Sequence, residues 1–140
     1  MAALTNYLES GILNHLFRQS SYIAPSTVYI GLNKSFISGN IESGITDEPN
    51  TGSYIRQQYI SNQSRWTTPY QSGSATAIYN NYPVEFPLAT ENIGNISGIF
   101  ISDASVSGNI LFYTALTSPR NIREGDQFII PSGSLKITFN

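Results

Sequence analysis

The 140-residue sequence contains no cysteine and a single histidine, His15. Without cysteine the chain has no disulfides, no thiolate nucleophile and no thiolate metal ligands. One histidine is too few for a zinc site, which takes three or four ligands. No nucleophile motif such as G-x-S-x-G accompanies His15, so a structural role for its ring is the expected one. We therefore expect no catalytic residues, no metal and no cofactor, and we predict that the protein is not an enzyme.

Charge is also scarce, because charged residues make up 11% of the chain and the formal net charge is −2. Typical soluble domains have about 25% charged residues. The seven Lys and Arg residues are scattered and form no basic stripe, so we expect no nucleic-acid partner. No apolar run approaches the length of about 20 residues that a membrane-spanning helix needs, so no membrane partner is expected. A polar but uncharged surface suits hydrogen bonding to neighbouring proteins.

The few carboxylates do not form a pattern typical of catalysis. The close pairs are Asp47 with Glu48 and Glu124 with Asp126, and both pairs lie in turn-like sequence. Glycoside hydrolysis uses two carboxylates that flank a substrate, which these pairs do not suggest. We expect them to serve in turns and in solubility. A weak calcium site in a loop stays open, although the EF-hand spacing is absent.

One amphipathic helix is predicted within residues 1–20. Large apolar residues recur at helical spacing there, with Thr5 or Asn6 as the N-cap. Their arc covers about half of the helix circumference, which is more than one sheet surface would cover. Two interpretations stay open: a helix in a groove of its own domain, or a helix between its domain and another subunit. Leu13 and Phe17 lie roughly opposite Leu4, so they are candidate interface residues.

The remainder of the chain, residues 27–140, shows alternating apolar and polar residues typical of short strands. Turns are predicted at Ser107-Gly108, at Gly125 and at residues 131–133, and residues 108–140 are expected to form three strands of one antiparallel sheet. Residues 33–53 are predicted to be a long surface loop. The segment YPVEFPL, residues 82–88, carries two prolines and is expected to be an edge strand or an extended segment.

These elements predict a mainly β protein, an antiparallel β-sandwich or jelly-roll-like domain with one N-terminal α-helix. We expect residues 1–140 to form a single domain, with the helix in residues 1–20 and the sandwich in residues 27–140. Trp66, Tyr70 and Tyr82 lie in or beside loop-like sequence, and aromatic residues are enriched at the centres of interfaces. We therefore add these three to Leu13 and Phe17 as interface candidates. A sugar-binding face is an alternative use of such rings.

The order of these motifs resembles a known family. The stretch LTNYLESGILNHLFRQSSYIAPSTVYIGL, then SYIRQQY with Trp66, then SGIFISDASVSGNILFYTALTSPRNIREGDQFIIPSGSLKITF are similar to small virion structural proteins of tailed bacteriophages. Members of this family are associated with the capsid, as cement or decoration proteins, or with the tail fibre. The resemblance implies a non-enzymatic virion protein that is assembled in the host cytoplasm.

Among these roles our first expectation is a capsid cement (decoration) protein that stabilises the head. A small domain without a heptad repeat suits this role better than a long trimeric fibre segment. A tail, neck or tail-fibre-associated component is the alternative, and a host-glycan-binding module is another. The expected partners are the major capsid protein or other virion proteins. We also expect a homo-oligomer, with a trimer favoured, because decorating subunits tend to follow local symmetry axes.

Overall fold

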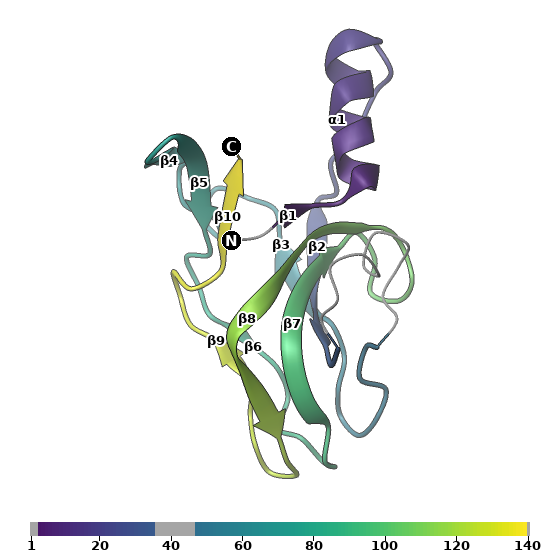
Figure 1. Cartoon of the computed structure of the whole chain (residues 1–140), viewed down its shortest axis with the longest axis vertical. Helices are drawn as coiled ribbons and strands as arrows, with labels where there is room; N and C mark the ends of the chain where they lie inside the picture. Colours follow the sequence, from purple (N-terminus) through teal and green to yellow (C-terminus); the bar gives the residue numbers. More distant parts are fainter. Residues whose placement is uncertain (1–2, 36–46, 140) are drawn as a thin grey trace.

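The computed structural model describes residues 3–35 and 47–139, and its regular structure is mainly antiparallel strands (Figure 1). Within these residues there is one helix, α1 (Asn6–Phe17), which follows the short strand β1 (Ala3–Leu4). The predicted mainly β fold with antiparallel sheets and one N-terminal helix is thus confirmed. No helix in the described residues is long and apolar enough to cross a membrane. The other strands are β2 (Thr27–Asn33), β3 (Gln57–Ile60), β4 (Tyr70–Ser72), β5 (Ala75–Tyr79), β6 (Val84–Glu85), β7 (Gly94–Ser102), β8 (Ile110–Ile122), β9 (Ile129–Ile130) and β10 (Lys136–Phe139).

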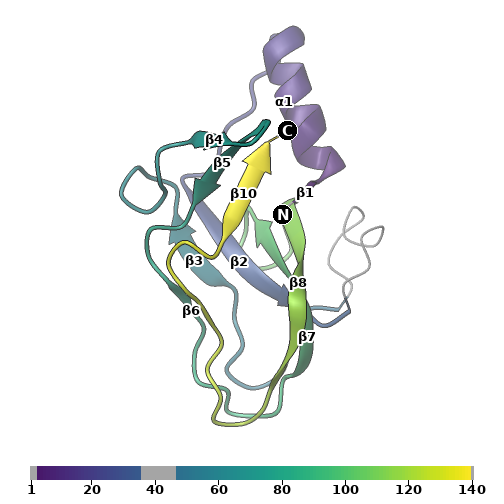
Figure 2. The same ribbon diagram turned by 60° about the vertical axis from the view of Figure 1, so that its left-hand side comes forward.

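The described strands form two facing sheets and a short ribbon (Figure 2). The larger sheet has the order β1-β8-β7-β2-β3, the smaller sheet has the order β10-β5-β4, and β6 pairs with β9. The main core lies between the sheets, where Ile30 and Ile101 of the larger sheet belong to the same buried cluster as Ile137 of the smaller one. The predicted single domain over residues 1–140 stays a prediction.

The packing of side chains on the outer face of the larger sheet requires a glycine at position 31. Gly31 on β2 is the register partner of Phe100 on β7. A Cβ atom added to Gly31 would lie 2.1 Å from Cζ of the Phe100 ring. A glycine inside a strand often marks such a close approach of another group. The absence of a side chain at Gly31 therefore lets the Phe100 ring lie against strand β2, where it is completely buried.

Arg56 covers the Phe100 ring, with its guanidinium carbon 4.9 Å from the ring centroid. The Arg56 side chain is only 5% exposed. Its Nε and Nη2 donate to the two carboxylate oxygens of Glu48, each over 2.9 Å. Its Nη1 donates to the carbonyl oxygens of Ala104 and Ser107, both over 2.8 Å. The loop between β7 and β8 is therefore fastened to the segment that precedes β3 by one side chain.

Tyr54 completes this polar cluster. Its hydroxyl donates to Glu48 Oε1 over 2.8 Å and accepts the backbone N–H of Leu32 over 2.9 Å. Burial raises the pKa of Tyr54 well above its ordinary value, so the hydroxyl keeps its proton and stays a donor. The expectation that Glu48 serves in a turn or in solubility is therefore incomplete, because Glu48 is the partner of a buried cation.

The prediction that residues 108–140 form three strands of one sheet is wrong. Strand β8 belongs to the larger sheet, β9 pairs with β6, and β10 pairs with β5. Alternation along the sequence predicts that each segment is extended, but it does not choose the pairing partner. Strand β8 continues through Pro119 to Ile122. Its pairing with β7 is irregular around this proline, since Ala115 pairs with Gly98 but Arg120 pairs with Ile96. Proline is tolerated in strands at such irregularities.

The predictions for the proline-containing segment and for the turns agree with the structure. Val84 and Phe86 of the proline-containing segment are buried, and β6 pairs only with β9 in the described structure, as expected for a short edge. The predicted turns at Gly125 and Gly133 are present, and both glycines have positive φ angles. Alternation in the C-terminal segment SLKITF predicts that Thr138 faces outward, but Thr138 is buried. The predicted surface loop of residues 33–53 lies partly outside the described residues, and its first residue, Asn33, ends strand β2.

We predict that Arg56→Met destabilises the fold strongly. Removal of the guanidinium leaves Glu48 without its cation and removes the Arg56 donor from the carbonyl groups of Ala104 and Ser107. Breaking a buried pair by removing one partner costs about 3–5 kcal/mol. Urea unfolding of the purified variant measures this loss.

The matched control is Arg123→Met, which removes an exposed arginine and should change the unfolding free energy by less than about 0.5 kcal/mol. The double variant Arg56→Met/Glu48→Leu should recover part of the loss, because no unpaired charge remains. Equal effects of the two arginine substitutions would contradict the importance of the cluster.

Candidate functional site

Helix α1 stands out from the body of the molecule, to which its first turn is attached (Figure 1). Thr5, one of the two predicted candidates, is the N-cap: its side chain accepts the backbone N–H of Leu8 over 3.4 Å. The backbone N–H of Thr5 donates to the carbonyl of Leu111 on β8 over 3.0 Å. Within the described helix, Leu8 is the one fully buried residue. The base of the helix is therefore fixed to the larger sheet, and the rest of the helix extends beyond it.

The segment that follows the helix runs back along one side of it. The ring of Tyr22 lies against Gly11, where an added Cβ atom would come within 2.8 Å of the ring. The backbone N–H of Tyr22 donates to Nδ1 of His15 over 3.2 Å. His15 thus has a structural contact in the helical hairpin, as an acceptor of a backbone N–H. These contacts stabilise the hairpin formed by α1 and residues 18–25, which we call the helical hairpin.

The opposite side of α1 carries large apolar side chains that nothing in the described structure covers. Leu13 is 57% exposed, Leu16 is 64% exposed and Phe17 is 78% exposed. At about 100° per residue these three lie within about 100° of arc, on the side away from Gly11. We call this surface the helix face. The interpretation of a helix in a groove of its own domain is therefore wrong, because the helix has only its first turn and one side in contact with its own chain.

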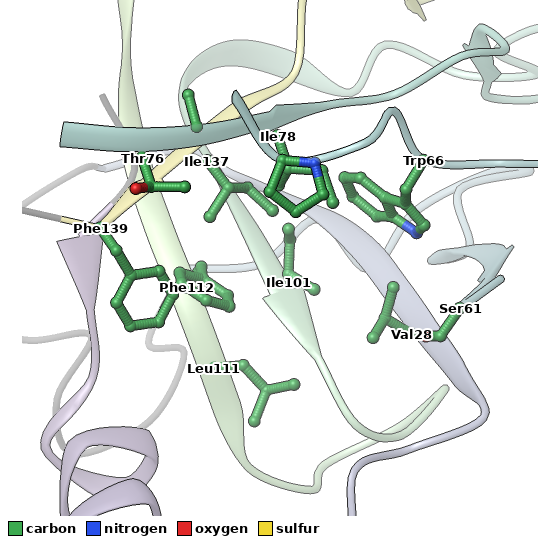
Figure 3. Close-up of a pocket in the computed structure, with 12 residues that line it drawn as sticks. Val28, Ser61, Trp66, Thr76, Ile78, Ile101, Leu111, Phe112, Ile137 and Phe139 are labelled. Atoms are coloured by element: carbon green, nitrogen blue, oxygen red, sulfur yellow. The ribbon is translucent and has the colours of Figure 1, made fainter. Parts of the chain in front are cut away.

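An open apolar cleft lies between the two sheets, beside the base of the helix (Figure 3). Its volume is about 370 Å³. Ile101, Leu111 and Phe112 of the larger sheet form one wall, and side chains of β5 and β10 form the other. None of the described residues that line the cleft is charged. They are Val28, Ser61, Trp66, Pro69, Thr76, Ala77, Ile78, Ile101, Leu111, Phe112, Ile137 and Phe139.

Trp66 lines this cleft and also packs against the core. Its ring meets the ring of Tyr59 edge-on, with centroids 5.1 Å apart. The Tyr59 hydroxyl lies 2.8 Å from the carbonyl oxygen of Arg65, to which it donates, and it accepts the backbone N–H of Tyr82 over 3.2 Å. Trp66 is therefore held in place by the fold, with part of its ring forming the cleft wall.

The two tyrosine candidates lie elsewhere. Tyr82 is exposed, and the Arg65 guanidinium carbon lies 4.9 Å from its ring centroid. Tyr70 on β4 stacks on Tyr79 of β5, with ring centroids 5.4 Å apart. A hydrogen bond from Tyr70 lowers the pKa of Tyr79, and the nearby Lys136 ammonium acts in the same direction. The five interface candidates thus do not form one surface, although Leu13 and Phe17 share the helix face.

Sequence reasoning missed the cleft and the exposure of Leu16. The sequence alternation identified the strands that carry the cleft residues, but it does not show that two sheets diverge and leave a gap between their apolar faces. In the described residues, no group of three or more His, Asp or Glu side chains is placed to hold a metal ion. The surface features that are present, an apolar helix face and an uncharged apolar cleft, are suited to contacts between proteins.

A family comparison extends this conclusion. The family model described as "Podophage GP4 fiber I protein gp80" matches residues 3–138. The match places the chain in the class of structural proteins of tailed-phage virions, as the sequence resemblance predicted. The chain belongs to the podophage GP4 fiber I protein gp80 family. No curated protein matches the sequence.

We predict that Leu8→Ala and Phe17→Ala differ sharply in their effect on the isolated subunit. Leu8 is buried at the base of the helix, and truncation of a buried leucine costs about 2–5 kcal/mol of unfolding free energy. Phe17 contributes little to the core, so its truncation should cost less than about 0.5 kcal/mol. Thermal unfolding of both variants, at a concentration at which the chain is monomeric, measures the difference. A large loss of melting temperature in Phe17→Ala would show that Phe17 packs within its own subunit.

Proposed function

We propose that this protein is a fibre-associated structural subunit of a podophage virion, without catalytic activity, and that the helix face attaches it to its neighbours. The observation that carries the proposal is the family match, which spans residues 3–138 and therefore includes the helix, both sheets and the ribbon. A match of this extent concerns the whole described architecture rather than one motif. It supports a role in which the complete fold is a building block.

The family description favours the tail-fibre-associated alternative over a capsid cement protein. Our first expectation rested on small size and on the absence of a heptad repeat, which are properties of the chain that do not identify its place in the particle. A small β-rich subunit can belong to a fibre assembly without forming the fibre shaft. In this role the chain connects other virion proteins and needs contact surfaces rather than a reactive site.

The helix face supplies a contact surface of the required kind. It presents Leu13, Leu16 and Phe17 on an element that projects from the body and is attached to the larger sheet at its base. An exposed cluster of this kind favours aggregation in a free protein and is typical of a surface that a partner covers. We propose that its partner is a virion protein, and that incorporation into the particle depends on it.

We predict that the protein is found with the tail and fibre apparatus and not on the head. Quantitative mass spectrometry of purified virions, of tailless heads and of isolated tails measures its copies relative to the major capsid protein. Tails should retain the protein, and heads without tails should lack it. A high copy number on tailless heads would contradict the fibre-associated role and support the cement role.

A further inference from the structure

We propose that the cleft between the two sheets receives the helix face of a second copy of the same chain. This inference rests on the proposed function, since it names the partner of the helix face. Both surfaces belong to the same chain and both lie near Leu111: its carbonyl accepts the N–H of Thr5 at the base of the helix, and its side chain lines the cleft. Each copy can thus donate one helix and accept one.

The size of the cleft fits two large side chains. An apolar protein cavity of about 150 Å³ holds a benzene ring. A cleft of about 370 Å³ therefore has room for roughly two side chains of that size. Leu13 and Phe17 are one helical turn apart on the same face, and residues at this spacing are neighbours on a helix surface. They are the two side chains that we expect to enter the cleft.

The helix face and the cleft are also chemically complementary, because both are apolar. None of the described residues that line the cleft is charged, so a polar or charged partner segment would lose its hydration there without compensation. Leu13, Leu16 and Phe17 have no such polar groups to dehydrate. The aromatic rings of Trp66, Phe112 and Phe139 in the cleft offer contact to an incoming Phe17 ring, and aromatic pairs contribute beyond their buried area.

The buried area favours a reciprocal or closed arrangement. From their exposed fractions, Leu13, Leu16 and Phe17 together leave about 400 Å² of surface uncovered. Covering this area with an equal area of the cleft and its rim buries about 800 Å² in total, which is small for a specific interface. Two reciprocal contacts in a dimer bury about 1,600 Å², the standard size. In a closed trimer each copy likewise takes part in two contacts.

Charge substitutions test the contact. Phe17→Glu places a carboxylate on the helix face, and Thr76→Arg places a cation in the cleft. Each should weaken self-association at least about tenfold, which corresponds to about 1.4 kcal/mol. The double variant Phe17→Glu/Thr76→Arg should regain association, because the new charges would meet across the interface. Ser118→Glu, at an exposed position of β8 away from the cleft, is the matched control and should associate normally. Sedimentation velocity measures all four proteins and the wild type.

The absence of cysteine allows an independent test. A chain with Phe17→Cys is mixed with a size-tagged chain with Thr76→Cys and oxidised mildly. A mixed disulfide between the two chains should form at least about tenfold more than in a mixture with tagged Ser118→Cys. Because each chain has one cysteine, the product reports contact between copies and never within one copy. This test remains decisive where Thr76→Arg does not fold.

The outcomes separate this inference from the proposed function. A wild type that stays monomeric, together with a Phe17→Cys and Thr76→Cys mixture that forms no mixed disulfide above the control, overturns the contact between copies. If Phe17→Glu is then also missing from virions, a different virion protein binds the helix face, and the proposed fibre-associated role stands. If the mixed disulfide forms but the protein is found on tailless heads, the contact between copies stands and the fibre-associated role fails.

Discussion

The contact of Gly31, Phe100 and Arg56 is the constraint on which the rest of the larger sheet depends. Gly31 leaves space for the Phe100 ring, the ring supports the Arg56 guanidinium, and the guanidinium binds Glu48. These groups come from β2, from β7 and from the segment before β3. One column of side chains therefore joins two central strands and buries the Phe100 ring on the outer face of the sheet. The chain has only seven Lys and Arg residues, and one of them, Arg56, lies at this buried position.

This arrangement explains why the other face of the larger sheet must meet the smaller sheet. A small protein buries about two-thirds of the surface of its unfolded chain, and here the polar cluster occupies one face. The apolar residues of β2, β7 and β8 therefore pack towards β5 and β10. The smaller sheet has three short strands and the larger sheet has five strands, two of them long, so the two do not cover each other fully. The open cleft lies between the apolar faces of the two sheets, where this mismatch leaves them incompletely packed against each other.

Much of the local structure could be predicted from the sequence, because it depends on neighbours in the chain. The N-cap at Thr5, the alternation of β2 and the turn glycines at 125 and 133 are of this kind. Arg56 could not be predicted: its acceptors Ala104 and Ser107 lie 48 and 51 residues away, and nothing in SYIRQQYI shows that the arginine turns inward. The pairing of β9 with β6 and of β10 with β5 was missed for the same reason, since several partner strands have similar alternation.

The candidate site likewise combines features that could be predicted from the sequence with features that could not. The width of the apolar arc predicts that Leu13 and Phe17 are not covered by the surface that covers Leu4, and the structure places both in the exposed part of the helix. The position of residues 18–25, which follow the helix, could not be predicted, yet this segment determines which side of the helix stays exposed. Tyr22 occupies the side of Gly11 and His15, so the free side is the one with Leu13, Leu16 and Phe17. Because the helical hairpin is stabilised by its own contacts, it can present these side chains before any partner binds. A preformed surface loses less conformational entropy on association, which is an advantage when the buried area of each contact is small.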